Sequence, residues 1–303
     1  MAGSTRGSTQ GKYASIERKW LAYCNANKIS TQATTNSFMN FLAGEFGRNL
    51  SYNYIKGYTA ALTTYIKDVD YDLVKKLRRG MFNVRPPRPK YCAIWDVNAV
   101  LTFLSAMRTD TLMYLSQKLA TLLMILSGNR VNMLSHMKLT LMVMTEEECT
   151  FTFDNPLKHS REGRKTDIMT FRAYPETALC PVKAIAKYVE IRGPLSGDPE
   201  LFVTTVRQHH KASHDTLARW IKDTLLAAGI DTGTYQAHSC RAASTTTASL
   251  AGISLVTILK SASWANANTF YRYYQKEIDE HYEKAEENFG VALLEQYNVS
   301  LSS

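Results

Sequence analysis

The sequence predicts a mainly α-helical protein with a small β-sheet, divided into two domains. Its 303 residues are more than a single domain usually contains. Hydrophobic residues make up 45% of the chain, which is enough to form a core. Most apolar residues recur at helical spacing, and the stretches 149–153 and 168–172 alternate as strands do. These two strands flank the polar stretch 158–165, so we expect a hairpin with a charged tip.

The first third of the chain is predicted to be a compact bundle of short helices over residues 12–80. Thr35 and Ser37 are the candidate N-caps of its second helix. The fourth helix carries four cations and is expected to end ahead of Gly80. Residues 1–11 lack apolar periodicity, and we expect them to be a flexible lead-in.

A proline-rich stretch separates the two predicted domains. Three prolines in four positions of Arg85-Pro-Pro-Arg-Pro-Lys90 cannot continue a helix, and they stiffen a short linker. We therefore expect one domain over 12–84, a linker over 85–90, a second domain over 91–278 and a C-terminal segment over 279–303. A long loop within one domain is the alternative.

The second domain is expected to add helices to the hairpin, together with a short strand over 201–203. Apolar periodicity places the helices over residues 95–107, 112–126, 181–191, 216–228, 242–251 and 255–261.

Positive charge is concentrated in the first third of the chain. Residues 1–90 hold 15 basic and 5 acidic residues, and residues 91–303 hold 21 basic and 22 acidic residues. A basic domain joined to a nearly neutral one is typical of a DNA-binding segment followed by a working domain. A charged surface that keeps the protein soluble is the alternative.

Several functional classes are excluded by missing patterns. No run of about 18 uncharged apolar residues is present, and the first residues lack the apolar centre of a secretory signal. Five cysteines without metal-ligand spacing indicate a reducing compartment, without disulfides or a zinc site. Glycine-rich phosphate loops, His-Glu-x-x-His, Gly-x-Ser-x-Gly and carboxylate clusters are also missing, so we expect neither a cofactor nor a metal.

What remains is a set of scattered groups that bind phosphate without a metal. The set comprises two arginines, a lysine, a histidine, an indole and a cluster of tyrosines. They occur as Ser127-Gly-Asn-Arg130, Lys158, His238-Ser-Cys-Arg241, Trp264 and Phe270-Tyr-Arg-Tyr-Tyr274.

In this order, these residues resemble the tyrosine recombinase (phage-integrase-like) family. The sequence motifs are most similar to those of recombinases of DIRS- and Ngaro-type retrotransposons, and the resemblance covers most of the chain. It implies a helical core-binding domain and an α+β catalytic domain that close on DNA as a C-shaped clamp. The matching fragments are Ile94-Trp-Asp-Val97, Ala237-His-Ser-Cys-Arg-Ala-Ala-Ser244 and Trp264-Ala-Asn-Ala-Asn-Thr-Phe-Tyr-Arg-Tyr-Tyr274.

The resemblance implies an enzyme that cleaves and rejoins DNA through a 3′-phosphotyrosyl intermediate, without ATP or metal. Arg130 and Arg241 would hold the non-bridging phosphate oxygens, and Trp264 would donate from its indole. Lys158 would protonate the leaving 5′-oxygen. His238 would act as the base or as a further phosphate donor.

Two of these assignments leave alternatives open. Family patterns place the nucleophile nine or ten positions after the tryptophan. Tyr274 is the expected nucleophile, Tyr273 is the alternative, and Tyr271 ranks behind both. Lys165 lies on the same hairpin as Lys158 and is the alternative general acid.

Double-stranded DNA is the expected partner. Cations of the first domain and the linker would contact phosphates with salt-sensitive affinity. A helix with Asn53, Tyr54, Lys56 and Tyr58 is expected to enter a groove. The phosphate contacts are assigned to Lys56, Lys75, Lys76, Arg78, Arg79, Arg85, Arg88 and Lys90.

The C-terminal segment is acidic first and then apolar. Family members commonly pass such a last helix to a neighbouring protomer. The resemblance therefore implies a homo-oligomer, a tetramer on two DNA duplexes, and a helix folded back on its own domain is the alternative. An intracellular location is expected, nuclear in a eukaryote, where Lys75-Lys-Leu-Arg-Arg79 would be a weak localisation signal.

Two other functions are kept beside the recombinase, which would integrate a mobile element. A type IB topoisomerase relaxes DNA by the same chemistry without a second partner, and the candidate exchange helix argues against it. A domesticated, inactive DNA-binding protein is the other, and the intact set of candidate catalytic residues argues against that.

Overall fold

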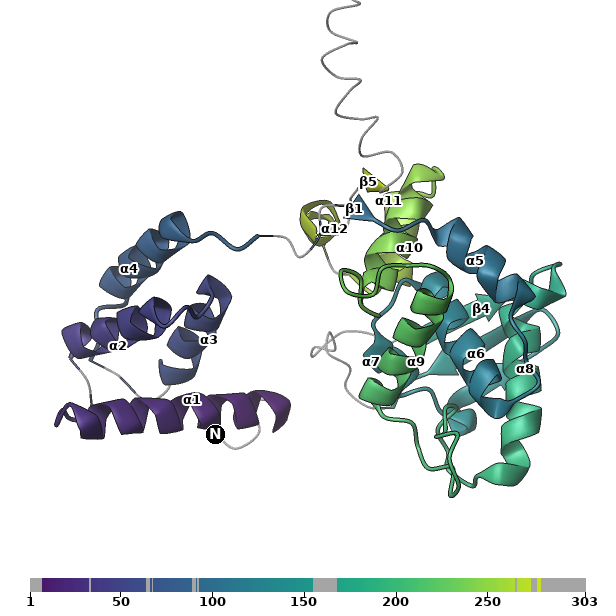
Figure 1. The fold of residues 1–303 in the computed structure, drawn as a ribbon, viewed down its shortest axis with the longest axis horizontal. Helices are drawn as coiled ribbons and strands as arrows, with labels where there is room; N and C mark the ends of the chain where they lie inside the picture. The colour runs from purple at the N-terminus through teal and green to yellow at the C-terminus, as the bar shows by residue number, and fades with distance from the viewer. Residues whose placement is uncertain are drawn as a thin grey trace, which may run out of the picture. The chain divides into compact units, whose positions relative to one another are not determined.

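The chain divides into two compact units, residues 1–89 and residues 90–303, in the computed structural model (Figure 1). The division falls inside the proline-rich stretch. The structure describes residues 7–32, 34–63, 66, 68–88, 91, 93–154, 168–264, 266–273 and 277–278.

The first unit is a helical bundle in its described part. Its helices are α1 (Gly7–Ala26), α2 (Thr35–Gly47), α3 (Tyr52–Leu62) and α4 (Tyr71–Val84). Helix α3 packs against the other three, and an aromatic core lies between them. Trp20 is 2% exposed, and its ring meets Phe41 edge-on with centroids 5.2 Å apart. Burial of large rings of this kind stabilises a small bundle.

Arg85 ties the end of α4 to the loop between α2 and α3. Its Nη2 donates to the carbonyls of Phe46, at 2.6 Å, and Leu50, at 3.2 Å, and its Nη1 donates to the side-chain oxygen of Asn49. Its guanidinium also lies 4.0 Å from the centroid of the Phe46 ring. Arg85 therefore has a structural role in the first unit, where the sequence predicts a DNA contact.

The helix boundaries of the first unit differ from the sequence prediction in three places. Helix α1 begins at Gly7, inside the expected lead-in, and its first turns carry no apolar periodicity that could have indicated a helix. Thr34 is the N-cap of α2, and its Oγ1 accepts from the backbone N–H of Ser37 at 3.2 Å. Helix α4 continues through Gly80 to Val84, because a single glycine weakens a helix without ending it.

The second unit contains helices, a three-stranded sheet and a two-stranded sheet. Strands β2 (Met142–Met144), β3 (Glu148–Thr152) and β4 (Ile168–Arg172) form an antiparallel sheet in the order β2-β3-β4. Pairing of Cys149 with Phe171 confirms that the two predicted strands pair antiparallel, and the charged tip over 158–165 lies outside the described residues. Strands β1 (Ala93–Ile94) and β5 (Glu277–Ile278) pair in parallel.

Helix α6 is the centre of this unit, and it contacts helices α5, α7, α8, α9 and α10 (Figure 1). Most of its residues are buried. The longer helices are α5 (Val97–Ala106), α6 (Leu112–Ser127), α8 (Pro181–Arg192), α9 (His214–Ala227) and α10 (Ser239–Leu250); the short ones are α7 (Val131–Leu134), α11 (Leu255–Ser261) and α12 (Ala267–Tyr273).

The sequence prediction is wrong about one strand and incomplete about others. Residues 201–203 form no strand, and Val203 makes an isolated bridge to Lys211. Strands β1, β2 and β5 were not predicted, because two or three residues are too few to show an alternating pattern. The predicted fold class, mainly α with a small sheet, is confirmed.

Candidate active site

The loop that carries Arg130 begins at the end of α6. Gly128 ends this helix in a left-handed conformation, with φ of +59°, and its backbone N–H donates to the carbonyl of Met124 at 3.1 Å. Arg130 follows as the N-cap of α7, and its carbonyl accepts from the backbone N–H of Met133 at 2.8 Å. The turn therefore places Arg130 in the short connection between the end of α6 and the start of α7.

Arg241 joins this loop to the end of α11. It lies in the first turns of α10 and has no exposed surface. Its Nη1 donates to the carbonyl of Gly128 at 3.0 Å, and its Nη2 donates to the carbonyl of Ala262 at 2.8 Å. Arg241 is thus bonded to the residue two positions before Arg130, and the two arginine segments lie next to each other.

The turn after α11 places Trp264 over Arg241. Ser263 adopts a left-handed conformation, with φ of +53°. The backbone N–H groups of Ser263 and Trp264 donate to the carbonyls of Lys260 and Leu259, at 3.2 and 2.8 Å. This is the Schellman pattern of a helix end. The indole then lies with its centroid 4.3 Å from the Arg241 guanidinium carbon, at cation–π distance.

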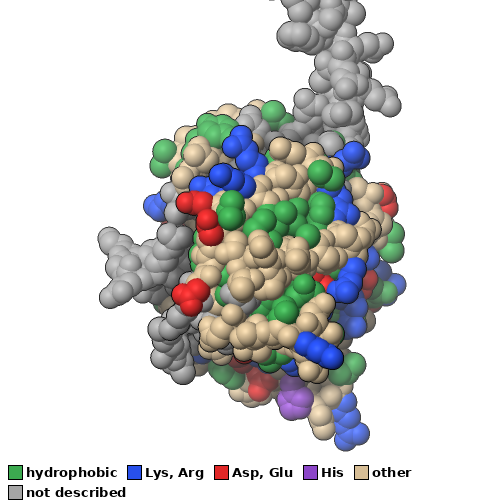
Figure 2. Space-filling model, turned by 90° about the vertical axis from the view of Figure 1, so that its left-hand side faces the viewer, with side chains coloured by type: hydrophobic (Ala, Val, Ile, Leu, Met, Phe, Trp, Pro, Cys, Tyr) green, Lys and Arg blue, Asp and Glu red, His purple; other side chains and the backbone are tan. Residues whose placement is uncertain are grey.

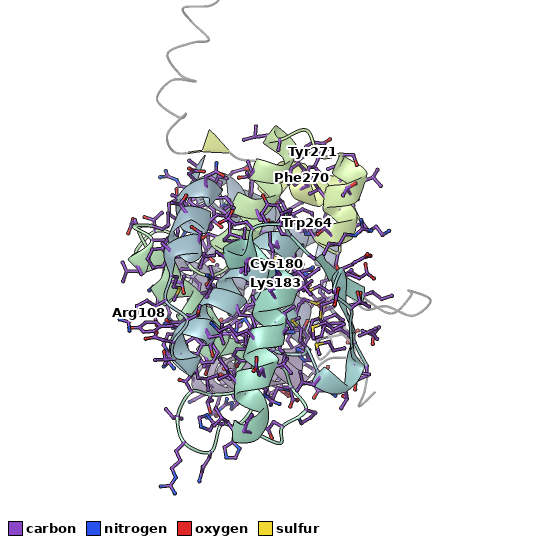
Figure 3. All side chains as sticks on the ribbon, turned by 90° about the vertical axis from the view of Figure 1, so that its right-hand side faces the viewer. Arg108, Cys180, Lys183, Trp264, Phe270 and Tyr271 are labelled. Atoms are coloured by element: carbon purple, nitrogen blue, oxygen red, sulfur yellow. The ribbon has the colours of Figure 1, made fainter. Side chains whose placement is uncertain are left out.

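Helix α12 brings Phe270 and Tyr271 to the same region. Phe270 is 1% exposed and packs against Trp264 with ring centroids 5.9 Å apart. Tyr271 lies beside Phe270 and is 55% exposed. Figure 3 shows these three side chains together at one end of the second unit. Tyr273 is the last residue of α12, and its side chain lies outside the described part of the structure.

His238 stands at the start of α10, one turn before Arg241, and is exposed. The next residue, Ser239, is buried and accepts a hydrogen bond from the Trp95 indole at 2.8 Å. This bond fixes the start of α10 against the chain that follows β1. It also gives Trp95 a physical role: two of the matching fragments in the sequence are in direct contact.

Cys240 is the other reactive residue type in this segment. It is completely enclosed, and burial raises the pKa of its thiol to about 12. A thiol with such a pKa stays protonated and is a poor nucleophile at neutral pH. The exposed groups of the segment, rather than its cysteine, are therefore available for chemistry.

The predicted site residues fall into two groups. The structure brings Arg130, Arg241, Trp264 and the His238 segment together. The sequence predicts that Arg241 contacts a phosphate directly. In this structure its side chain is fully enclosed, with the Trp264 ring over the guanidinium and two carbonyls bonded to it, so it is closed to such a contact. Lys158, its alternative Lys165, Tyr274, Lys90 and residues 279–303 lie outside the described residues.

The cations predicted to contact DNA from the first unit differ in exposure. Lys56, Lys75, Lys76, Arg79 and Arg88 are exposed, and Arg78 is half-buried. On the face seen in Figure 2, lysine and arginine side chains are spread over several separate places.

The predicted groove-facing helix needs one correction. Asn53, Tyr54 and Lys56 are exposed, but Tyr58 is 4% exposed. Its hydroxyl accepts from Nζ of Lys19 at 2.8 Å, so Tyr58 packs inside the bundle. Its spacing on α3 matches the buried face of that helix.

Two residues of the site were not predicted from the sequence. Asn129 and Ser261 lie 132 positions apart and hydrogen-bond to each other's segments. Only the polar character of Asn129, beside an arginine at the end of an apolar helix, could have indicated a role.

Replacement of Gly128 by alanine is expected to lower the free energy of unfolding by about 2–3 kcal/mol. An added Cβ would lie 3.0 Å from Cγ2 of Thr245, on top of the cost of the left-handed φ. Denaturant unfolding checks this. Gly229→Ala is the control, because Gly229 has φ of +87° and open space around its Cβ position, so its loss should be about 1 kcal/mol. Equal losses for the two variants would contradict the steric part.

The described residues contain neither a metal-binding group nor a membrane-spanning helix. No group of three or more His, Cys, Asp or Glu side chains is arranged to hold a metal ion. Within the described ranges, no helix is both long and apolar enough to cross a lipid bilayer.

Comparison with solved structures finds DNA recombinases. The XerH site-specific recombinase, bound to palindromic difH substrate in a post-cleavage complex, is 15% identical, with a TM-score of 0.61 over 87% of this chain and 73% of that one. The Tn1549 transposon integrase in complex with transposon right end DNA is 13% identical, with a TM-score of 0.62 over 95% of both chains. A lambda integrase dimer bound to a COC′ core site is 13% identical, with a TM-score of 0.54 over 89% of this chain and 72% of that one.

Comparison of the sequence with models of protein families and with curated proteins finds no match. At the identities of the solved structures, the likeness is one of fold, and it extends over both units of the chain. The chain therefore has the fold of the tyrosine recombinases.

Proposed function

We propose that this protein is a site-specific DNA recombinase that integrates a mobile element of the DIRS/Ngaro type. The observation that carries the proposal is the bridge made by Arg241, which joins the Arg130 loop to the Trp264 turn. This bridge lies in a fold whose solved examples include recombinases and integrases bound to DNA. Double-stranded DNA is the proposed partner.

The proposed reaction exchanges one phosphodiester for another. The tyrosine hydroxyl oxygen bonds to phosphorus, and the bond from phosphorus to the 5′-oxygen breaks. His238 accepts the phenol proton, and Lys158 gives a proton to the leaving 5′-oxygen. The product is a 3′-phosphotyrosine and a free 5′-hydroxyl, and attack by another strand's 5′-hydroxyl reverses the step. The energy of the broken bond is kept in the intermediate, so no ATP is used.

The arginines stabilise charge that develops on the non-bridging oxygens. Arg130 is half-buried and supplies the direct contact. Arg241 supplies positive charge from beneath the Trp264 ring, and it holds the Arg130 loop through its bond to Gly128. It would reach the phosphate itself only when the Trp264 turn moves aside. Displacement of Trp264 from its position over Arg241 would also bring the buried indole N–H to the surface, where a phosphate can reach it.

Binding of DNA is proposed to use both units, closed around the duplex as a clamp. The exposed cations of α3 and α4, with Arg88, would neutralise backbone phosphates. Four copies on two duplexes would exchange their C-terminal segments, residues 279–303. Inside a cell with a nucleus, such a protein would work in the nucleus.

A nicked suicide substrate tests the proposal. The nick releases a short fragment after cleavage, so religation fails and the covalent complex accumulates. We expect a protein–DNA band that survives denaturation, and none when Tyr271, Tyr273 and Tyr274 are all replaced by phenylalanine. The substrate is selected first from a library of element ends.

The suicide substrate, together with a plasmid-relaxation assay, separates the competing functions. Relaxation of a supercoiled plasmid without strand exchange would favour a type IB topoisomerase. DNA binding without a covalent complex, on every selected substrate, would favour an inactive DNA-binding protein and would overturn the recombinase proposal.

A further inference from the structure

We infer that Asn129 and Ser261 are positioning residues that fix the direction in which Arg130 leaves its loop. This inference rests on the proposed function. The two residues form a clasp of two hydrogen bonds: Nδ2 of Asn129 donates to the carbonyl of Ser261 at 2.7 Å, and Oγ of Ser261 donates to the carbonyl of Ser127 at 3.0 Å. Both bonds reach the last residue of α11, one from the Arg130 loop and one from the end of α6 that precedes it.

The clasp satisfies groups that the helices leave open. The last carbonyls of a helix have no partner inside it. At the end of α11, the carbonyl of Ser261 is taken by Asn129 and that of Ser127, at the end of α6, by the Ser261 hydroxyl. Asn129 is 3% exposed, so its amide replaces water as the partner of a helix end.

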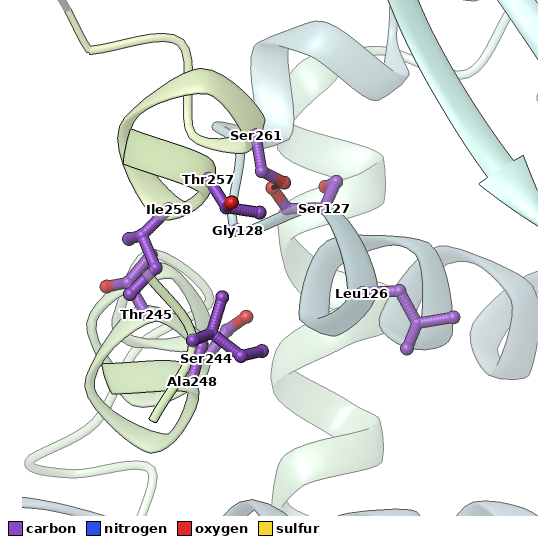
Figure 4. Close-up of a pocket in the computed structure, with 10 residues that line it drawn as sticks. Leu126, Ser127, Gly128, Ser244, Thr245, Ala248, Thr257, Ile258 and Ser261 are labelled. Carbon is purple, nitrogen blue, oxygen red and sulfur yellow. Dashed lines mark hydrogen bonds between the residues drawn. The ribbon is translucent and has the colours of Figure 1, made fainter. Parts of the chain in front are cut away.

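Close packing reaches this side of the loop at Gly128, and hydrogen bonds hold its neighbours Ser127 and Asn129. A hollow of about 250 Å³ opens behind Ser127, Gly128 and Ser261, with α10 and α11 as its other walls (Figure 4). A loop that borders a hollow is free to shift unless directional bonds fix it. The clasp therefore sets the position of the loop where side-chain packing does not.

Arg130 receives this constraint directly. It follows Asn129 in the chain, and on its other side its own carbonyl caps the first turn of α7. The backbone of Arg130 is thus held from both directions. Because a displacement of about 1 Å at a reacting centre lowers rate by about 10²-fold, loss of the clasp acts on the chemical step.

The test is the single-turnover cleavage rate of pre-bound suicide substrate. We expect Asn129→Ala and Ser261→Ala to lower this rate by about 10- to 100-fold, with DNA affinity changed by less than about threefold. Thr257→Val is the matched control. Thr257 lines the same hollow, its hydroxyl contacts Ser254, and this variant should cleave at the wild-type rate.

A double-mutant cycle separates positioning from a general structural role. Arg130→Lys keeps a charge but loses the planar fork. If the clasp orients that fork, Asn129→Ala lowers the rate by less than about threefold in the Arg130→Lys background. An equal loss in both backgrounds, or wild-type cleavage by Asn129→Ala and Ser261→Ala, would overturn the inference. Thermal unfolding of each variant shows whether it is folded. If Asn129→Ala does not fold, the same cycle is measured with Ser261→Ala, which is the milder change.

Failure of the proposed function can be distinguished from failure of the positioning role alone. A wild-type protein that forms no covalent complex overturns the proposed function and the positioning role with it. A wild-type protein that cleaves, beside clasp variants that cleave equally fast, overturns only the positioning role.

Discussion

Tyr274→Phe is expected to form no covalent complex with a nicked suicide substrate, and Tyr273→Phe to form it at the wild-type level. The reason is the orientation of α12. Phe270 points into the core beside Trp264, and Tyr271, about 100° further around the helix, points to solvent. Helical spacing alone predicts that position 274 lies about 40° from position 270 on the side of position 271, between the buried and the exposed directions and so at the edge of the site. The same spacing predicts that position 273 lies about 60° to the other side of position 270.

A nucleophile must be reached by DNA from solvent and still be backed by the arginine site, which is what an edge position provides. The spacing of the retrotransposon-type pattern, ten positions after Trp264, agrees with this assignment. Covalent trapping on a denaturing gel measures it, and Tyr271→Phe is the exposed control that should cleave normally. Loss of trapping in Tyr273→Phe, with trapping retained in Tyr274→Phe, would reverse the assignment.

The sequence predicts the elements that depend on neighbours along the chain. Helical periodicity locates most helices of both units, and α9 shows why: Leu217, Trp220 and Leu225 recur at helical spacing and share its buried face. The β3–β4 hairpin was predicted for a similar reason, because five residues of alternation in each strand suffice to define a face.

Contacts between distant segments could not be predicted in this way. The Asn129–Ser261 clasp and the Trp95–Ser239 bond join residues more than 130 positions apart, and no spacing rule connects them. Arg85 shows the opposite error. Its place in a basic, proline-rich stretch indicates DNA, but the carbonyls of Phe46 and Leu50 take its guanidinium in the folded unit. A charge count cannot tell an arginine that binds its own backbone from one that binds phosphate.

Arg241→Ala is expected to damage both the fold and the chemistry. The side chain is fully enclosed, and its loss leaves the carbonyls of Gly128 and Ala262 without their donor. Each buried carbonyl left unpaired costs about 1–3 kcal/mol, so we expect the free energy of unfolding to fall by about 3–5 kcal/mol. Loss of a preorganised cation should also lower the cleavage rate by about 10²–10³-fold.

Comparison with two other variants identifies which property of Arg241 matters. Arg241→Lys keeps the charge, but one ammonium cannot bond both carbonyls in a plane beneath the Trp264 ring, so cleavage should stay close to that of the alanine variant. Arg130→Ala should lose as much cleavage as Arg241→Ala with a smaller loss of stability, because Arg130 is only half-buried.

Denaturant unfolding and single-turnover cleavage, measured on the same preparations, separate these effects. If Arg241→Ala unfolds within about 1 kcal/mol of the wild type, the two carbonyl bonds do not hold the loops together. If it cleaves at the wild-type rate, Arg241 is no part of the site. A large loss of stability with full recovery of cleavage in Arg241→Lys would instead show that charge alone, and not the bridge between the Arg130 loop and the Trp264 turn, supports the reaction.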